Sequence, residues 1–308
     1  MNILKQVELV VQALDFASLD ELKMADALII GEKEYGLRLP YYYSHDELIK
    51  AIQKIKNNGQ RVYLAINNIF HEYDLNKLDQ YIDEMKDYPI DGLIFGDLAV
   101  YQIAEKYNLV DRLIYNPETY MTNYMSVHFF KEKGIKRVVL AKEITLEDTK
   151  MIGQEVDMEL EVLVHGAVNM FHSKRNLVTN YFRYIEKDQP DQLKDEPLYI
   201  VEEKRKNLKY PIIEDHHGTH IYREHDMCAI EYLDELVNNG ITSLRIDSVF
   251  KSIEQLTAVI SIYRQAINDL IEGRYEEHKS SYIEQLETIP GLRSFDTGFL
   301  FKKTVYKG

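Results

Sequence analysis

The chain has 308 residues, a length that fits either two domains or one large α/β barrel. Hydrophobic residues make up 45% and charged residues 29% of the chain, a composition typical of a soluble globular protein with a sizeable core. The formal net charge of −14 argues against strong unaided binding of nucleic acid, because proteins that hold nucleic acid alone usually carry a basic face.

Targeting and redox signals point to the cytoplasm. No stretch approaches the roughly 18 apolar residues that a membrane span needs, and the N-terminus lacks a long apolar run. The single cysteine, Cys228, excludes an internal disulfide and any multi-cysteine metal site within one chain. We therefore expect a cytoplasmic protein that does not contact a membrane, with a buried and unreactive thiol at Cys228.

Short β-branched runs alternate with amphipathic segments from the first residues onward. In chain order, the predicted strands are Val7–Val11, Ala27–Gly31, Arg61–Ile66, Gly92–Gly96, Arg112–Tyr115, Arg137–Ala141, Glu159–Val164 and Ser243–Ile246. The predicted helices are Leu19–Met24, Ser44–Asn57, Asn76–Tyr88, Ala99–Tyr107, Asn123–Lys133, Leu146–Glu155, Asp226–Asn238 and Ile253–Ile271. Eight strands in alternation with helices favour a closed (β/α)8 barrel of the TIM type, with an open α/β sheet as the alternative.

Local signals support several of these boundaries. Ser44 followed by Glu47 predicts a capping box at the start of a helix. Gly59, Gly134 and Gly240 each follow a helical pattern and precede a strand, where a left-handed cap residue is expected.

The regular spacing between successive predicted strands is interrupted once. About 80 residues separate the seventh strand from the eighth, far more than one helix and two loops need. Leu198–Val201 and Tyr210–Ile213 look extended within that gap, so we predict a β-rich insertion at about 183–225. The barrel with its insertion then covers residues 1–272, and residues 273–308 form a short C-terminal extension.

Active sites of barrel enzymes collect at the carboxyl ends of the strands, where this sequence has polar residues at nearly every position. His165 follows an apolar strand and precedes a glycine, so we expect it to act as a hydrogen-bond donor or general acid–base. A helix cap or a bond to the next loop is the competing interpretation of each polar residue. The predicted catalytic residues are His165, Glu32, Asp97, Glu143 and Asp247, and Asn67, Asn116 and Glu118 stand at further strand ends.

Cations near this rim would suit an anionic ligand. Arg38 and Arg175 are predicted to clamp a carboxylate or phosphate, and Lys142 and Lys251 are further candidates. Surface ion pairs are the alternative for each of them. The predicted substrate-binding residues are Arg38, Asn67, Asn116, Ser173 and Arg175.

One histidine run, His216, His217 and His220 beside Asp215, invites a metal interpretation. Its spacing matches neither the helical HExxH pattern nor a zinc finger, and a turn around Gly218 explains the run equally well. We therefore expect no metal in this chain, with a metal site on this run as the alternative.

The stretch Glu159–Tyr181 (ELEVLVHGAVNMFHSKRNLVTNY) resembles the signature of the collagenase-like peptidases, family thirty-two of the peptidases of unassigned catalytic type. The segments HDMCAIEYLDELVNNGITSLRID, IIGEKEYGLR, FGDLAV and DTGFLF fit the same family, so the resemblance covers most of the chain. The signature positions present here are Glu161, Val164, His165, Gly166, Ala167, Ser173, Arg175, Leu177 and Tyr181.

The resemblance implies a TIM-like barrel and two kinds of activity. The family's older name implies a collagenase-like peptidase, whereas better-understood members are oxygen-independent hydroxylation factors for transfer RNA, ribosomal RNA and ubiquinone. Those members hold a four-iron four-sulfur cluster on four cysteines. Two of the cysteine positions are Asn169 and Asn176 here, and Lys174 replaces the usual glycine before Arg175, so we expect no iron–sulfur cluster in this chain.

A short chain without cluster cysteines is similar to the shorter of two family proteins that occur together in many Gram-positive bacteria. That pair is associated with 5-hydroxyuridine at the wobble position of tRNA, with prephenate implicated as the hydroxyl source. The resemblance implies that this chain is the shorter subunit and pairs with a longer cysteine-bearing paralogue. That paralogue would carry the iron–sulfur cluster, and tRNA would be bound through the complex. A peptidase and a non-catalytic scaffold subunit are the alternatives.

Overall fold

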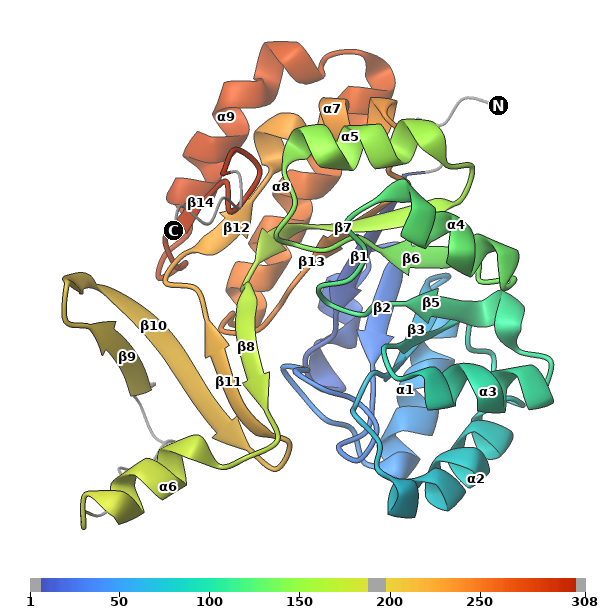
Figure 1. Cartoon of the computed structure of the whole chain (residues 1–308). Coiled ribbons are helices and arrows are strands. Elements are labelled where there is room, and N and C mark those ends of the chain that lie inside the picture. Colours follow the sequence, from blue (N-terminus) through green and yellow to red (C-terminus); the bar gives the residue numbers. More distant parts are fainter. Residues whose placement is uncertain (1–6, 188–197, 303–308) are drawn as a thin grey trace.

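The computed structural model describes residues 7–187 and 198–302 and contains a closed barrel of eight parallel strands (Figure 1). The barrel strands are β1 (Glu8–Gln12), β2 (Ala27–Ile30), β3 (Arg61–Ile66), β4 (Gly92–Phe95), β5 (Leu113–Tyr115), β6 (Arg137–Val139), β7 (Glu159–Gly166) and β13 (Ser243–Ile246). Each strand from β1 to β7 pairs with the next, and β13 pairs with both β1 and β7. The β7–β13 pairing closes the barrel, which confirms the predicted (β/α)8 fold and excludes the open sheet.

Helices cover the outside of the barrel between the strands. They are α1 (His45–Asn57), α2 (Leu75–Met85), α3 (Leu98–Lys106), α4 (Tyr124–Glu132), α5 (Leu146–Glu155), α7 (Leu233–Asn238) and α8 (Ile253–Glu272). Between β1 and β2 the chain forms a 3₁₀ helix at Ala17–Leu22 in place of the predicted α-helix Leu19–Met24. The 3₁₀ helix is six residues long, which is about two turns at three residues per turn.

Sequence signals set some of the helix boundaries and not others. Gly59, Gly134 and Gly240 have φ angles of 79°, 81° and 94°, so all three take the left-handed conformation that was expected of them. The predicted capping box does not form, because the side chain of Ser44 makes no capping bond. The carboxylate of Glu47 instead accepts a hydrogen bond of 3.1 Å from the hydroxyl of Tyr41.

A second sheet of four antiparallel strands stands beside the mouth of the barrel (Figure 1). Its order is β8 (Asn169–Ser173), β11 (Gly218–Tyr222), β10 (Arg205–Asp215) and β9 (Leu198–Glu202). The sheet begins directly after β7, earlier than the predicted start at about 183, because the chain leaves the barrel into β8 without a helix. Residues 188–197 of the predicted insertion lie outside the described residues.

The helix α6 (Leu177–Tyr184) is attached to this sheet by a carboxylate at its N-terminus. The carboxylate of Glu214 on β10 accepts a 2.8 Å hydrogen bond from the backbone N–H of Val178 in the first turn. A negative charge at this end of a helix satisfies N–H groups that have no partner within the helix.

The segment 226–238 is the clearest difference from the predicted elements. It is not one helix but strand β12 (Asp226–Cys228), a 3₁₀ turn at Ile230–Tyr232 and then α7. The carboxylate of Asp226 is buried and lies 2.5 Å from both Lys251 and Arg293. These two charges hold Asp226 at the end of the barrel, and β12 pairs antiparallel with β7 in an extended conformation.

The C-terminal segment folds back onto the barrel. Helix α9 (Tyr275–Glu287) packs against α8, and the hydroxyl of Tyr282 donates a 2.6 Å hydrogen bond to Asp269. The short strand β14 (Phe295–Asp296) then pairs parallel with β12. Residues 303–308 of the predicted extension lie outside the described residues.

The barrel interior is charged at its N-terminal end and apolar in the middle. At the N-terminal end, Arg137 lies 2.7 Å from Glu8 and 2.7 Å from Glu159, and Tyr63 donates a 2.6 Å hydrogen bond to Glu8. The apolar layer above it contains Val10, Ala27, Ile29, Leu39, Tyr63, Ala65, Ile94, Ile114 and Val139. This packed layer separates the N-terminal end from the carboxyl ends of the strands, where the candidate site lies.

Candidate active site at the barrel mouth

A cavity of about 480 Å³ lies at the carboxyl ends of the barrel strands. One wall comes from the loops that follow the strands, and the opposite wall comes from β8 of the second sheet. The loop residues include Arg38, Asn67, Asp97, Asn116, Glu118, Lys142 and Glu143, and β8 contributes Met170, Phe171 and His172. The structure therefore brings together five of the ten residues predicted for catalysis or substrate binding, which are Arg38, Asn67, Asp97, Asn116 and Glu143.

An ion cluster forms the centre of this cavity. The guanidinium of Arg38 lies 2.7 Å from one carboxylate oxygen of Glu118, and the ammonium of Lys142 lies 2.7 Å from the other. Burial opposes the charge of Glu118, but the two cations outweigh it and hold the pKa of Glu118 well below its usual range. The carboxylate in turn raises the pKa of Arg38, although burial opposes that charge too. The cluster therefore carries two positive charges and one negative charge.

Both residues of the Arg38–Glu118 ion pair have an unusual backbone. Arg38 and Glu118 adopt φ angles of 55° and 68°, in the left-handed region that residues with a Cβ rarely occupy. Phe250, at the neighbouring end of β13, has a φ of 67°. Strained residues of this kind gather at ligand sites, where the surrounding structure holds them in place.

Three of the lining residues hold the loops together. Asp97 caps α3 by accepting a 3.0 Å bond from the N–H of Ala99, and its other oxygen accepts a 3.0 Å bond from the N–H of Phe70. Asn67 accepts a 2.9 Å bond from the N–H of Leu37, and Asn116 accepts a 3.3 Å bond from the N–H of Glu118. These bonds fix the strand-end loops, and with them Arg38 and Glu118.

Asp247 and Glu32 lie outside the residues that line the cavity. Asp247 sits at the end of β13, where desolvation raises the pKa of its carboxyl group to about 6 against the pull of Lys251 and Arg245. Glu32 lies on the far side of the following loop, 3.0 Å from the imidazole of His45 on α1. That contact raises the pKa of His45.

His165 points away from the cavity. Its side chain is fully buried and packs against the rings of Tyr263 on α8 and Phe295 on β14. Neither ring nitrogen has a hydrogen-bond partner among the described residues, and desolvation lowers the pKa well below that of a free histidine. The pairing register of β7 shifts between Leu163 and His165, and a shift of this kind turns the following side chain to the other face of a strand.

Ser173 and Arg175 also lie outside the cavity wall, at the far end of β8. The hydroxyl of Ser173 accepts a 3.2 Å bond from the N–H of Arg175, whose side chain is exposed. The residue that β8 turns toward the cavity near this point is His172, which sequence reasoning missed. The strand β8 was not predicted, so no sequence pattern singled out His172.

Two positions matter for the iron–sulfur question. Asn169 pairs with Tyr222 at one end of β11, whereas the residue after Asn176 donates a hydrogen bond to Thr219 at the other end. Three residues of extended strand, or about 10 Å, separate those two ends. The thiol of Cys228 is buried beside Tyr263, and burial raises its pKa to about 11. Asn169 begins β8 and Asn176 follows that strand, and neither position carries a thiol.

Comparisons with known proteins agree with this architecture. The model of Peptidase family U32 matches residues 18–307. The chain belongs to that family. Among its relatives, tRNA hydroxylation protein P2 of Bacillus subtilis strain 168 is 39% identical over 92% of this chain and 93% of that protein. tRNA hydroxylation protein P of Escherichia coli K12 is 26% identical over 91% of this chain and 71% of that protein.

Other family members carry a different name or a known structure. An uncharacterized protease of Methanocaldococcus jannaschii is 29% identical over 90% of this chain and 68% of that protein. The solved structure of a U32 peptidase superposes with a TM-score of 0.50 at 17% identity, covering 78% of this chain and 92% of that one. This likeness supports the barrel fold. None of the helices in the described ranges is long and apolar enough to cross a membrane.

Proposed function

We propose that this chain is the shorter subunit of an enzyme that forms 5-hydroxyuridine at the wobble position of tRNA. The observation that carries the proposal is the 39% identity to tRNA hydroxylation protein P2, which extends over nearly the full length of both proteins. A match of that extent includes the barrel, the second sheet and the mouth cavity together, and not one motif alone.

The mouth cavity is proposed to bind the small anionic substrate, with prephenate as the candidate. A volume of about 480 Å³ lies in the range of small-molecule sites, which run from about 300 to 1,000 Å³. Arg38 and Lys142 supply two cations, and Glu118 neutralises only one of them. A ligand carboxylate can therefore bind beside Glu118 or replace it on Arg38. Glu143, which lines the cavity, is the carboxyl group proposed to orient the ligand and move protons.

The iron–sulfur chemistry is assigned to a partner. Asparagine side chains are poor iron ligands beside thiolates, and Asn169 and Asn176 occupy two of the positions at which the cluster-binding members carry cysteine. We therefore place the cluster on a longer cysteine-bearing paralogue, and give this chain the task of binding the small substrate and part of the RNA.

The RNA contact of this chain is proposed to lie beside the mouth. A second cavity of about 530 Å³ is lined by three lysines, Lys33, Lys77 and Lys174, and shares Asn68 with the mouth cavity. The same lining includes Glu34 and Asp74, so three lysines stand against two carboxylates, in a chain whose net charge is −14. Phosphate contacts of this kind position RNA without reading its sequence.

Replacing Lys33, Lys77 and Lys174 together by glutamine tests this surface. Loss of three phosphate contacts should weaken tRNA binding by the assembled complex at least tenfold and lower the salt dependence of the binding constant by about two units. The matched control replaces three exposed lysines on and after α4, which are Lys131, Lys133 and Lys136. Equal losses in both triple variants, measured by filter binding at several salt concentrations, would indicate general charge and not a defined surface.

The test of the proposed function is made in cells. The gene is deleted in a host that lacks redundant routes, and digested tRNA is analysed for 5-hydroxyuridine by mass spectrometry. The nucleoside should disappear and return with the native gene, whereas Arg38→Gln should restore little of it. Unchanged 5-hydroxyuridine in the deletion strain would contradict the proposal. Cleavage of gelatin by the purified protein would then favour the peptidase alternative.

A further inference from the structure

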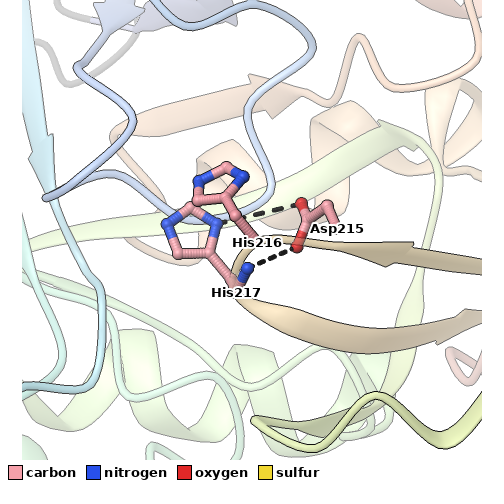
Figure 2. Close-up of side chains that lie close together, drawn as sticks. All are labelled: Asp215, His216 and His217. Carbon is pink, nitrogen blue, oxygen red and sulfur yellow. Dashed lines mark hydrogen bonds and ion pairs between the residues drawn. The ribbon is translucent and has the colours of Figure 1, made fainter. Parts of the chain in front are cut away.

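The turn between β10 and β11 gathers metal-ligating side chains at one point. Only two residues, His216 and His217, form this turn, and they follow Asp215 at the end of β10. Figure 2 shows the two imidazoles lying one over the other and next to the carboxylate of Asp215, and the ring centroids are 3.7 Å apart. One ligand atom from each of the three side chains lies within 4.8 Å of the other two.

The backbone of the barrel mouth fixes the tautomers of both histidines. The Nε2 atoms of His216 and His217 lie 3.1 Å and 2.8 Å from the carbonyl oxygen of Lys33. A carbonyl oxygen only accepts hydrogen bonds, so both Nε2 atoms carry a proton and both Nδ1 atoms keep a lone pair. Donation of the second ring N–H to a backbone carbonyl is the usual arrangement behind a metal-bound imidazole.

The gap between His217 and Asp215 has the size of an ion. The Nδ1 atom of His217 lies 3.8 Å from Oδ2 of Asp215. Zinc–nitrogen and zinc–oxygen bonds of about 2.0 to 2.2 Å sum to slightly more than this distance, so one ion can contact both atoms with little movement. The hydroxyl of Tyr42 lies 3.4 Å from the same nitrogen, a long distance for a hydrogen bond.

Two more histidines lie behind this group. The Nε2 atom of His220 on β11 is 3.3 Å from the second oxygen of Asp215, and the ring of His172 on β8 stacks on His220 at 4.7 Å. The side chain of His220 is 1% exposed, and its Nδ1 atom has no hydrogen-bond partner within the described part of the chain. A buried imidazole held on a carboxylate in this way orients that carboxylate toward its other neighbours.

We propose that Asp215, His216 and His217 bind one divalent transition-metal ion at the edge of the barrel mouth. Imidazole nitrogen with one carboxylate favours ions such as Zn²⁺, Fe²⁺ or Co²⁺ over Mg²⁺ and Ca²⁺, which prefer oxygen ligands. This assignment departs from the expectation of no metal, which rested on linear spacing alone. It does not depend on the proposed function, because its evidence is the side-chain geometry of the hairpin.

The proposed ion faces the second cavity. His216 and His217 both line that cavity with Lys33 and Lys174, so the remaining coordination positions are open to water or an anionic ligand. The ion would also tie the β10–β11 hairpin to the loop that carries Arg38, because both histidines are bonded to Lys33 of that loop. We therefore expect metal binding to stabilise the arrangement of the two cavities.

The test is a titration of the purified, chelator-treated full chain with Co²⁺, followed by its visible absorption and by calorimetry. The native chain should bind about one Co²⁺ with a dissociation constant below about 10 µM and show the ligand-field bands of a nitrogen–oxygen site. Asp215→Asn and His217→Gln should each weaken binding at least tenfold. His128→Gln on α4 is the control, and it should bind as the native chain does.

Each outcome decides the proposal. A native chain that binds no Co²⁺ at about 100 µM, or Asp215→Asn and His217→Gln variants that bind it as tightly as the control, would overturn the site and indicate an adventitious ion only. Melting curves without metal identify a variant that fails to fold, and the two ligand variants alter different residues so that either one suffices. Bound Co²⁺ should also raise the melting temperature of the native chain and not that of the ligand variants.

Discussion

At the scale of single residues, the Arg38–Glu118–Lys142 cluster carries two costs in free energy, one from its backbone conformation and one from the burial of charge. Left-handed backbone at Arg38 and Glu118 costs of order 1 kcal/mol each, and burial of the three charges costs more. The mutual contacts of 2.7 Å offset these costs only while all three charges are present. Under the proposed function, a ligand carboxylate would take over the role of Glu118 on these cations.

Replacing Glu118 by glutamine tests this interpretation. The change leaves Arg38 and Lys142 without a carboxylate, so the free energy of unfolding should fall by about 2 to 4 kcal/mol. Added prephenate should restore part of that loss and should bind the variant more tightly than the native chain. Urea unfolding with and without the ligand measures both effects. A loss that prephenate does not change would mean that the cluster is structural and that the cavity does not select anions.

Asp247, at the end of β13, makes the stability of the folded chain depend on pH. Its pKa of about 6 lies above the ordinary value of 3.8, so the unfolded chain releases this proton at a lower pH than the folded chain. The free energy of unfolding should therefore fall as the pH rises from about 4 to 6. Above pH 6 the full cost of burying the ionised carboxylate should be present. Asp247→Asn removes this cost and should gain about 2 kcal/mol relative to the native chain between pH 4 and 7. Urea unfolding of both proteins across this range measures the difference, and a constant difference would contradict the raised pKa.

At the scale of elements, two glycines allow α5 and the end of α7 to cross closely. A Cβ atom added to Gly153 would lie 1.8 Å from the carbonyl oxygen of Asn239, and one added to Gly240 would lie 2.6 Å from the carbonyl oxygen of Gly153. These are backbone atoms and cannot rotate away. The helices that flank β7 and β13 therefore reach their positions only with glycine at this crossing.

Gly153→Ala should consequently destabilise the barrel although alanine is the better helix former. We expect a loss of about 3 kcal/mol, since the clash outweighs the gain of about 1 kcal/mol in helix propensity. Gly59→Ala is the control, because its Cβ would meet no atom within 4 Å and would cost only the left-handed backbone, about 1 kcal/mol. Equal losses in the two variants, measured by thermal unfolding, would show that α5 can move away from Asn239.

The strands and the mouth were predictable because each rests on a local pattern. Buried parallel strands are continuous apolar runs, and the barrel order then places Asn67, Asp97, Asn116 and Glu143 at one end. Arg38 was predicted as a clamp and does line the cavity. Glu118 was named as a strand-end residue, but its ion pairs depend on a left-handed backbone that no sequence pattern announces.

The remaining elements depend on contacts distant in the sequence. His165 leaves the predicted mouth because of a register shift against β13, and Asp226 starts a strand because Lys251 and Arg293 hold it. The histidine cluster needs the Lys33 carbonyl, which lies about 180 residues away in the sequence. Helical periodicity and linear spacing contain no information on such pairings.

At the scale of the whole molecule, charge and missing thiols divide the proposed reaction between two chains. A subunit with a net charge of −14 has one basic cavity beside its mouth among the described residues, and its single thiol is buried. Under the proposed function, this subunit would hold a small anion and part of an RNA backbone, and a partner would supply the iron–sulfur cluster and most of the cationic surface. Neither chain alone should then carry out the modification.

Co-purification of the tagged chain from its native host, under anaerobic conditions, tests this division. We expect a longer family member to accompany it, with iron and sulfide in the complex and none in this chain after separation. Full activity on tRNA should require both chains, because the proposal places the cations Arg38 and Lys142 in this chain and the iron–sulfur cluster in the partner. A chain that elutes alone, or one that modifies tRNA without a partner, would contradict the division of labour. Iron that stays with the isolated chain would instead direct attention to the histidine cluster at Asp215, whose ligands the cobalt titration identifies independently.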